Sequence, residues 1–304
     1  MAGERELRFA DGSPVRAASA VARLGAGWLV AQDDATAGAW LAGRDAVSAQ
    51  RVRLLPPVDG HDVFSEAGGT KRSKPDLEAA VELPASLGGG VLLLGSGSLP
   101  NRRRAVLVTE RTAGVDVLVA DLGPLYERVT TVLGLAPADL NLEGACVVGD
   151  RLRWFQRGHH RGSVPSGSVD VDVTAVVATL RGDGDGGSIT VSDPRTYDLG
   201  AVGGVTLAVT DSAVLPDGRI VVSASAEDTA DAVADGPVVG SALAVIEGTT
   251  VVGVAPIAAT GEAVKLEGIA VVTAGDGAVT LLGVVDQDDP ERPSLALDLE
   301  LTWR

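Results

Sequence analysis

Cysteine is almost missing from this sequence of 304 residues, since Cys146 is the only one. A single cysteine excludes an internal disulfide and a metal site built from clustered cysteines, and it fits a reducing compartment. Long apolar runs are missing too, and the N-terminal segment MAGERELRFADGSP has charges and a turn where a secretory signal needs an apolar stretch. We therefore expect a cytoplasmic protein that does not contact a membrane.

Positive charge is also scarce. The formal net charge is −16, and lysine occurs only at Lys71, Lys74 and Lys265. Arginine is frequent by comparison, a bias that favours a bacterial genome rich in G and C. Because phosphate binding needs a cationic surface, this charge argues against nucleic acid as a partner and favours cations.

Aromatic residues make up only 3% of a chain that is 45% hydrophobic, and the sequence contains 39 glycines and 15 prolines. Such a chain can bury a large core, and its Val, Leu and Ala content favours thin layers of strands joined by tight turns. The composition therefore favours an all-β fold.

One sequence pattern occurs five times. Each copy has a short apolar run, a turn rich in Gly and Asp, and a second apolar run that ends in polar residues, which is the signature of a β-hairpin. NLEGACVV and KLEGIAVV, at residues 141–148 and 265–272, are the clearest pair. The aligned positions are Ala18, Glu78, Glu143, Asp211 and Glu267, and the hairpins are expected near residues 15–34, 76–97, 141–158, 209–228 and 265–286.

Further strand-like runs follow these hairpins, among them residues 104–110, 114–122, 168–180 and 241–248. Units of four strands that recur about every 60 residues are typical of β-propeller blades. The sequence predicts a five-bladed propeller over residues 1–304, with six blades as the alternative. The lone strand near the N-terminus should complete the last blade and close the ring. Residues 123–135 have helical spacing, which predicts a short helix.

Acidic residues recur at the start of the first strand in four of the five units. In a propeller this strand lines the axis, so Glu78, Glu143, Asp211 and Glu267 should point to one rim. Clustered carboxylates need protons or a cation, and oxygen ligands without Cys favour Ca²⁺, with Mg²⁺ as the alternative. In a second interpretation, the acids bind backbone N–H groups and hold neighbouring blades together.

The ends of the hairpins carry charges of different sign at the same rim. Asp33 and Asp286 end blades one and five, and either could serve as a general base. The basic side chains gather in blades two and three; Arg102, Arg157, His61 and Lys74 are expected to bind substrate, and His159 is placed with the catalytic residues. An internal network of ion pairs is the alternative.

These residues lead to two hypotheses of function. The first is a metal-dependent hydrolase of a phosphate ester or a similar anionic small molecule at the axial rim. The second is a propeller without catalytic activity that binds a ligand or a protein there. The sequence indicates no oligomeric state.

Three segments carry a family resemblance: KLEGIAVV at 265–272, RWFQRGHHR at 153–161 and LVAQDDATAG at 29–38. They resemble the soluble calcium-activated nucleotidases (apyrases), which are five-bladed propellers. The resemblance implies that Glu78, Glu143 and Glu267 are calcium-site acids and that Asp33 and Asp34 face the substrate. Ala18 and Ala35 depart from that pattern. The LEG hairpins and the DQDD segment at 286–289 also resemble phytase-like and esterase-like bacterial propellers and their uncharacterised relatives.

Overall fold

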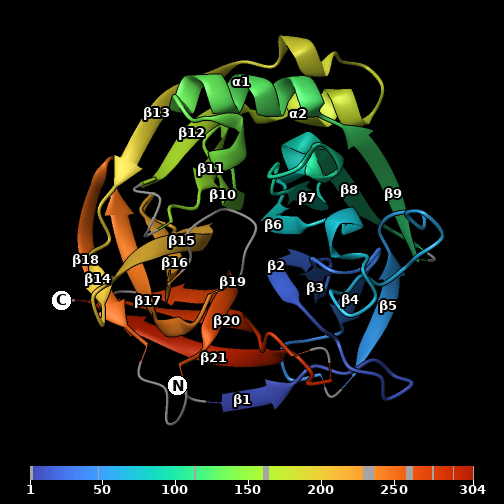
Figure 1. The fold of residues 1–304 in the computed structure, drawn as a ribbon, viewed down its shortest axis with the longest axis horizontal. Coiled ribbons are helices and arrows are strands. Elements are labelled where there is room, and N and C mark those ends of the chain that lie inside the picture. Colours follow the sequence, from blue (N-terminus) through green and yellow to red (C-terminus); the bar gives the residue numbers. More distant parts are fainter. Residues whose placement is uncertain are drawn as a thin grey trace.

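The computed structural model describes residues 3–46, 48–112, 114–159, 164–228, 236–257, 263–275, 277–289 and 291–303. Within these ranges, the strands form five antiparallel sheets that are arranged like blades around a central axis (Figure 1). The prediction of a five-bladed β-propeller is confirmed, and the six-bladed alternative is wrong.

Four blades have four strands each, and blade four has a fifth, very short one. Blade one contains β2 (Ala18–Leu24), β3 (Gly27–Gln32), β4 (Ala37–Leu41) and β5 (Ala49–Arg53). Blade two contains β6 (Leu77–Glu82), β7 (Val91–Gly95), β8 (Arg104–Arg111) and β9 (Gly114–Asp121). Blade three contains β10 (Leu142–Val148), β11 (Arg151–Gln156), β12 (Ser166–Asp172) and β13 (Val191–Tyr197).

Blade four contains β14 (Ala201–Val202), β15 (Val205–Val214), β16 (Ile220–Glu227), β17 (Val238–Glu247) and β18 (Thr250–Pro256). Blade five contains β19 (Lys265–Gly275), β20 (Ala278–Asp286), β21 (Leu295–Thr302) and β1 (Gly3–Glu6). The predicted closure is confirmed, because β1 pairs with β21 in antiparallel register from Gly3 opposite Asp298 to Glu6 opposite Leu295. The first and last strands therefore share one sheet.

The innermost strand of each blade contacts the innermost strand of the next. These strands are β2, β6, β10, β15 and β19, and β19 contacts β2 again, so they form a closed ring around the axis. Between neighbouring blades lie five apolar layers, one at each junction. Because each blade is covered on both faces, β3 and β7 are buried along their whole length and have nearly continuous apolar sequences.

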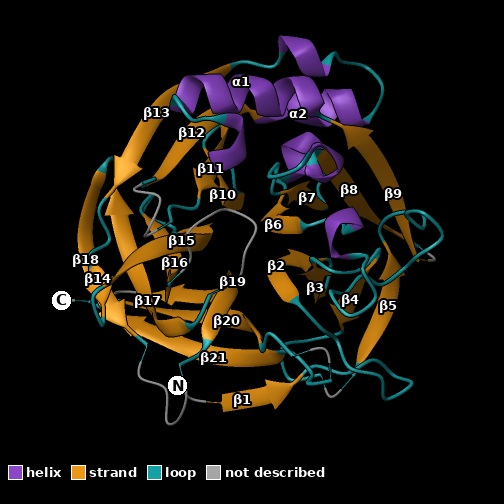
Figure 2. Cartoon of the chain, in the orientation of Figure 1, coloured by secondary structure: helices purple, strands orange, loops and turns teal. Residues whose placement is uncertain are grey.

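Two helices lie on the outer side of blades two and three (Figure 2). The predicted helix is confirmed as α1 (Gly123–Leu133), with Leu125 and Val129 buried. The expected strand at residues 168–180 is only half right, because β12 ends at Asp172 and α2 (Val173–Leu180) follows. Short apolar runs fit both a strand and a buried helix, and the Asp172 side chain decides for the helix by capping it through the N–H of Ala175.

Five short 3₁₀ turns lie in the connections of the described chain: η1 (Lys71–Ser73), η2 (Ala85–Leu87), η3 (Pro100–Arg102), η4 (Pro137–Asp139) and η5 (Gly186–Ser188). Among the described residues, no helix combines the length and the apolar character that crossing a bilayer requires. The turns η1 and η3 matter for the site, because they carry basic residues toward the axis.

Candidate functional site

Each innermost strand has an irregularity in its pairing at the same place. The register shifts after Ala18, Leu77, Leu142, Val209 and Leu266, so each strand has one extra residue there, as in a β-bulge. The residues at the bulges are Ser19, Glu78, Glu143, Thr210 and Glu267. The sequence alignment was therefore one residue out in blades one and four, where it chose Ala18 and Asp211.

The hydroxyl groups at this level join neighbouring blades. Ser19 Oγ donates a hydrogen bond of 2.6 Å to the carbonyl of Leu77, and Thr210 Oγ1 donates one of 2.6 Å to the carbonyl of Leu266. In both cases the acceptor is the residue before the glutamate of the next blade. Blades one and four thus replace the acid by a hydroxyl that bonds to the adjacent strand.

Asp211 lies one residue further along and is completely buried. Its two carboxylate oxygens accept hydrogen bonds from the backbone N–H groups of Ile269, at 2.8 Å, and Ser212, at 2.7 Å. Burial raises its pKa well above the usual value for an aspartate. This geometry matches the second interpretation of the acids, in which the side chain links two blades; the role of Asp211 as a metal ligand stays a prediction.

Steric constraints explain why the two LEG segments contain glycine. A Cβ atom at Gly144 would collide with the backbone of Asp211, and one at Gly268 would lie 2.8 Å from Cα of Ala20. The innermost strands of neighbouring blades therefore approach too closely for a side chain at this position. The motif combines an acid at the bulge with a glycine that lets two blades meet.

We call Asp33, Lys74, Asp76, Glu78 and Arg102 the Lys74 cluster. Lys74 Nζ contacts the Asp33 carboxylate and lies 2.7 Å from Asp76 Oδ1, while Arg102 NH1 lies 2.9 Å from Asp76 Oδ2. Asp33 follows β3, Lys74 follows η1, and Arg102 ends η3, so loops of blades one and two build the cluster.

Three carboxylates of this cluster form a group suited to a cation. One oxygen each from Asp33, Asp76 and Glu78 lies within 4.8 Å of the other two. Burial would raise the pKa of Asp76, but Lys74 and Arg102 lower it to about 2. Burial and the charges of Asp76 and Asp33 raise the pKa of Glu78 well above its usual value. In the described part of the chain, no hydrogen bond or ion pair to the Glu78 side chain is found.

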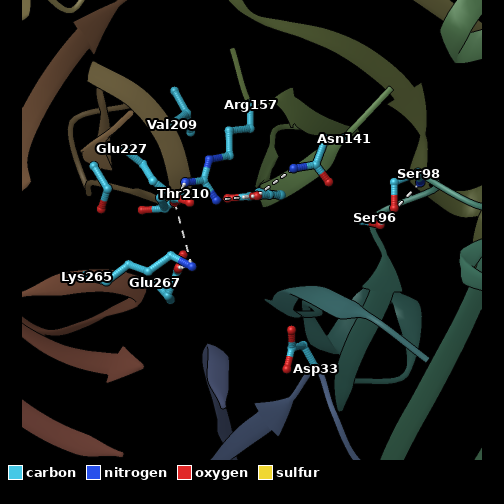
Figure 3. Close-up of polar contacts among 12 residues, drawn as sticks. Asp33, Ser96, Ser98, Asn141, Arg157, Val209, Thr210, Glu227, Lys265 and Glu267 are labelled. Carbon is cyan, nitrogen blue, oxygen red and sulfur yellow. Dashed lines mark hydrogen bonds and ion pairs between the residues drawn. The ribbon is translucent and has the colours of Figure 1, made fainter. Parts of the chain in front are cut away.

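We call Glu143, Arg157, Glu227, Lys265 and Glu267 the Arg157 cluster; Figure 3 shows most of it gathered apart from Asp33. Arg157 NH1 lies 3.0 Å from Glu143 Oε1, and its NH2 contacts Glu227. Lys265 Nζ lies 3.0 Å from Glu267 Oε1 and 3.8 Å from Glu227 Oε2. Arg157 of blade three and Lys265 of blade five thus form ion pairs with three buried glutamates.

Glu143 and Glu227 of the Arg157 cluster have pKa shifts of opposite direction. Burial raises the pKa of Glu143 to about 8, because the pull of Arg157 is partly cancelled by repulsion from Glu267. Burial acts on Glu227 too, but Arg157 and Lys265 lower its pKa below the usual value. Glu143 Oε2 is buried and has no hydrogen-bond partner among the described residues. A proton on this oxygen, or a further cation bound to it, would supply the missing partner.

A pocket of about 360 Å³ opens beside both clusters. Asp33 and Lys74 line it from the Lys74 cluster, Lys265 lines it from the Arg157 cluster, and Asp286 joins them from the end of β20. Burial, with repulsion from Asp33 and Asp288, raises the pKa of Asp286 to about 8 against the attraction of Lys265. The structure therefore brings the two expected general bases into one pocket.

The two histidines do not line this pocket. His61 is exposed in the loop before η1, with its ring centroid 6.5 Å from that of Phe64. His159 is 7% exposed, and its Nε2 lies 3.8 Å from Asp139 Oδ1 in blade three. His160 and Arg161, at the basic end of blade three, lie outside the described residues.

The arginines expected to hold an anion already have acidic partners. Arg102 is 2% exposed and is held by Asp76 and by Ser98 Oγ at 2.9 Å. Arg157 lies between Glu143 and Glu227. These contacts match the alternative of an internal ion-pair network, and anion binding by either arginine stays a prediction.

Comparison with known proteins identifies a family but no activity. Residues 70–290 match a family of unknown function, DUF6910. The chain belongs to this family. No curated protein matches the sequence.

Solved structures similar to this DUF6910 chain are distant. A GH43 endo-arabinanase from Bacillus licheniformis has 9% identity and a TM-score of 0.44, covering 97% of this chain and 96% of its own. MPT-4, a mannose phosphorylase from Leishmania mexicana in complex with phosphate ion, has 12% identity and a TM-score of 0.44, with 97% and 86% covered. MPT-1, a GDP-Man-dependent mannosyltransferase from the same organism, has 13% identity and a TM-score of 0.42, with 99% and 90% covered. The comparisons leave the resemblance to calcium-activated nucleotidases an expectation.

Sequence reasoning missed three charged residues of the site. Asp76 stands two residues before Glu78, Lys265 stands two residues before Glu267, and Arg16 pairs with Asp34 at the pocket wall. Asp76 and Lys265 could have been found, because each lies in the same repeated segment as an acid that was chosen. The Arg16 pair gives no such signal, since it depends on how the chain enters blade one.

Proposed function

We propose that the axial pocket is the active site of a metal-dependent hydrolase that acts on a phosphate ester or a similar anionic small molecule. The observation that carries the proposal is that Asp33 and Asp286, from blades one and five, line one pocket together with Lys74 and Lys265. These four residues, among the six acidic and four basic residues that line the pocket, could move protons and hold a negative charge at once.

The donor atoms fit a hard divalent cation. Asp33, Asp76 and Glu78 offer oxygen ligands only, and Glu78 has no partner within the described chain. Ca²⁺ suits such a set best, with Mg²⁺ as the alternative. When bound, the ion would polarise the substrate and its attacking water. The ammonium of Lys74, which now contacts Asp33 and Asp76, would have to move aside.

The chain's own residues would handle the protons and the substrate. Burial raises the pKa of Asp33, and Asp33 would serve as the general base if Asp76 and Glu78 hold the ion. Burial raises the pKa of Asp286 to about 8, which would let this group carry a proton and give it to the leaving oxygen. Lys265, whose ammonium lies 3.6 Å from Asp288 Oδ1, and Lys74 would face the anionic part of the substrate.

One observation favours the second candidate, a propeller that binds a ligand without catalysis. Arg102 and Arg157 are each already held by a buried carboxylate, so fewer cations are free to bind a substrate than the sequence led us to expect. A site with an excess of acids would then serve to bind a cation or a cationic ligand.

The test measures metal binding and turnover on the same samples. Protein stripped with EDTA is titrated with Ca²⁺ and Mg²⁺ by calorimetry and then assayed with p-nitrophenyl phosphate, bis(p-nitrophenyl) phosphate and a nucleoside triphosphate. Glu78→Gln should weaken metal binding at least about tenfold, whereas the exposed Glu300→Gln should not change it. Asp33→Asn and Asp286→Asn should abolish turnover, and Asp150→Asn in the β10–β11 turn should not.

Metal binding without turnover of any substrate would favour the non-catalytic candidate. Failure to bind either metal, together with no turnover, would overturn the hydrolase proposal. Turnover that persists in the presence of EDTA would show that the reaction needs no metal. The proposed active site would then consist of the two aspartates alone.

A further inference from the structure

A second cavity lies on the axis at the end opposite the acidic clusters. It holds about 410 Å³ and is lined by residues from all five innermost strands, together with the β6–β7 and β10–β11 turns. Cavities of this size are typical of small-molecule sites. Neither cluster of the proposed active site contributes a residue to its wall.

The register of the strands places five residues at one level of this cavity. Counting four positions from each bulge along β2, β6, β10, β15 and β19 gives Arg23, Glu82, Val147, Val214 and Val271, and all five line the cavity. Blades three to five present valine at this level. Blades one and two, whose innermost strands are neighbours, present one positive and one negative side chain at this level.

Neither of these two charges has an ionic partner. The Arg23 guanidinium lies 4.4 Å from the centroid of the Trp28 ring, a contact that leaves its N–H groups available. Within the described ranges, no ion pair joins Arg23 or Glu82 to any residue, including each other. A guanidinium beside a carboxylate at the mouth of a cavity can bind the two ends of a zwitterion.

The interior of the cavity is apolar except at one point. Val21, Ala80, Ile269 and Ala270 line it, and small side chains on neighbouring strands keep it open. The hydroxyl of Ser212 is 4% exposed and finds no hydrogen-bond partner among the described residues apart from the weak thiol of Cys146. A buried hydroxyl in this position is a group that a ligand can satisfy.

We propose that this cavity binds a free α-amino acid with an aliphatic side chain. Arg23 binds the carboxylate, Glu82 binds the ammonium group, and the side chain lies among the apolar residues below them. Glu82 is exposed and Arg23 is half-buried, so the pair lies at the mouth of the cavity, where a ligand with both charges gains two ionic contacts and one with a single charge gains only one. The site is independent of the proposed hydrolase pocket.

The first experiment measures the binding of leucine to the full chain by calorimetry. Leucine should bind, while leucinamide, which lacks the carboxylate, and 4-methylpentanoate, which lacks the ammonium group, should bind at least about tenfold more weakly. Glycine should also bind more weakly, because it has no side chain to bury. No heat with leucine at millimolar concentration would overturn the proposal.

Variants then assign the site. Arg23→Gln and Glu82→Gln should each weaken leucine binding at least about tenfold, and Ala213→Leu should block it by filling the cavity. The matched controls are Arg151→Gln at the start of β11 and Glu300→Gln on β21, which should bind leucine like the unmodified protein. Circular dichroism confirms that each variant is folded. Unchanged affinity in both Arg23→Gln and Glu82→Gln would contradict the proposed site.

The proposal for this cavity and the proposal for the hydrolase pocket can be refuted independently. Loss of phosphate-ester turnover in Asp33→Asn should leave leucine binding unchanged, and Glu82→Gln should leave metal binding unchanged. If 4-methylpentanoate binds as well as leucine, the cavity takes an apolar anion, and the role of Glu82 is wrong.

Discussion

The two acidic clusters at the axis contain the same kinds of side chain, yet Asp76 in one and Glu143 in the other have pKa shifts of opposite direction. In the Lys74 cluster, Asp76 contacts two cations, and its pKa falls to about 2. In the Arg157 cluster, Glu143 shares its arginine with Glu227, and its pKa rises to about 8. Both carboxylates are buried, so burial alone does not decide the result. The number of cations that contact each individual carboxylate does.

The clusters also differ in where their residues come from. Lys74, Asp76 and Glu78 lie within five positions of the chain, and the Lys74 cluster opens on the pocket. The Arg157 cluster joins blades three, four and five through Glu143, Glu227 and Glu267. We therefore expect the Arg157 cluster to matter more for stability and the Lys74 cluster more for function.

The largest effect on stability should come from Arg157→Met. This change leaves Glu143 and Glu227 buried without their shared cation, which costs about 3–5 kcal/mol. Chemical unfolding in urea at pH 7 measures it. Arg151→Met, at the start of the strand β11 that Arg157 follows, is the matched control; Arg151 is more exposed, and the change should alter stability by no more than about 0.5 kcal/mol. Equal effects of the two changes would show that the cluster does not hold the blades together.

The pH dependence of stability should show the raised pKa of Glu143. Its pKa is about 8 in the folded protein against an ordinary value of 4.5, so between these values the folded protein keeps a proton that the unfolded chain loses. This stabilisation is complete below pH 4.5 and is lost as the pH rises toward 8. A tenfold difference in proton affinity between the folded and the unfolded chain corresponds to about 1.4 kcal/mol, so the decline in stability amounts to a few kcal/mol.

Glu143→Gln should flatten this decline, as urea unfolding at pH 5, 6, 7 and 8 will show. Asp286, whose pKa is also about 8, contributes in the same direction and remains in the variant. The slope should therefore decrease without vanishing. If the variant and the unmodified protein lose stability equally between pH 5 and 8, Glu143 ionises normally and the comparison of the clusters fails.

Arg102→Met should cost less than Arg157→Met. Asp76 keeps Lys74 as a partner at 2.7 Å, so its charge stays compensated and the loss is limited to about 1–3 kcal/mol. Thermal unfolding of the two variants side by side gives the ranking. A cost for Arg102→Met as large as that for Arg157→Met would show that the second cation in contact with Asp76 does not compensate for the loss of the first.

The smallest effects should come from the two hydroxyls that occupy the bulge in place of an acid. Ser19→Ala and Thr210→Val each remove one hydrogen bond to a carbonyl of the next blade, at a cost of about 1 kcal/mol. Thr210→Val also removes the hydrogen bond of 2.9 Å between Thr210 Oγ1 and Ser223 Oγ, so its loss in urea unfolding should be the slightly larger of the two. A much larger loss for one of them would mean that the two junctions are not equivalent.

Much of the fold could be predicted from the sequence. The five hairpins repeat a pattern of apolar runs and turns, and the lone strand near the N-terminus completes blade five as expected. The helix α2 was missed because Val173–Leu180 is a short apolar run with β-branched residues, which fits a strand equally well. Its only local signal is Asp172, an N-cap residue that also occurs in turns.

Less of the candidate site could be predicted. The sequence placed the acids at the axis, but the extra residue in each innermost strand moves the repeat position to Ser19 in blade one and Thr210 in blade four. A bulge of one residue cannot be recognised from the pattern of apolar runs in the sequence. The partner of Asp33 was missed as well, because Lys74 reaches it through a long loop whose path the sequence does not reveal.

The sequence by itself determined that five similar units form a ring, because each hairpin buries its apolar runs only against another copy of itself. It also determined that acids and glycines recur at the axis. Only the tertiary structure decided which acids keep their charge, since that depends on how many cations lie within a few ångströms of a buried carboxylate. Those cations come from loops and from other blades. Coulomb attraction depends on the distance between two charges in space, and the sequence does not show which residues lie close together in the folded chain.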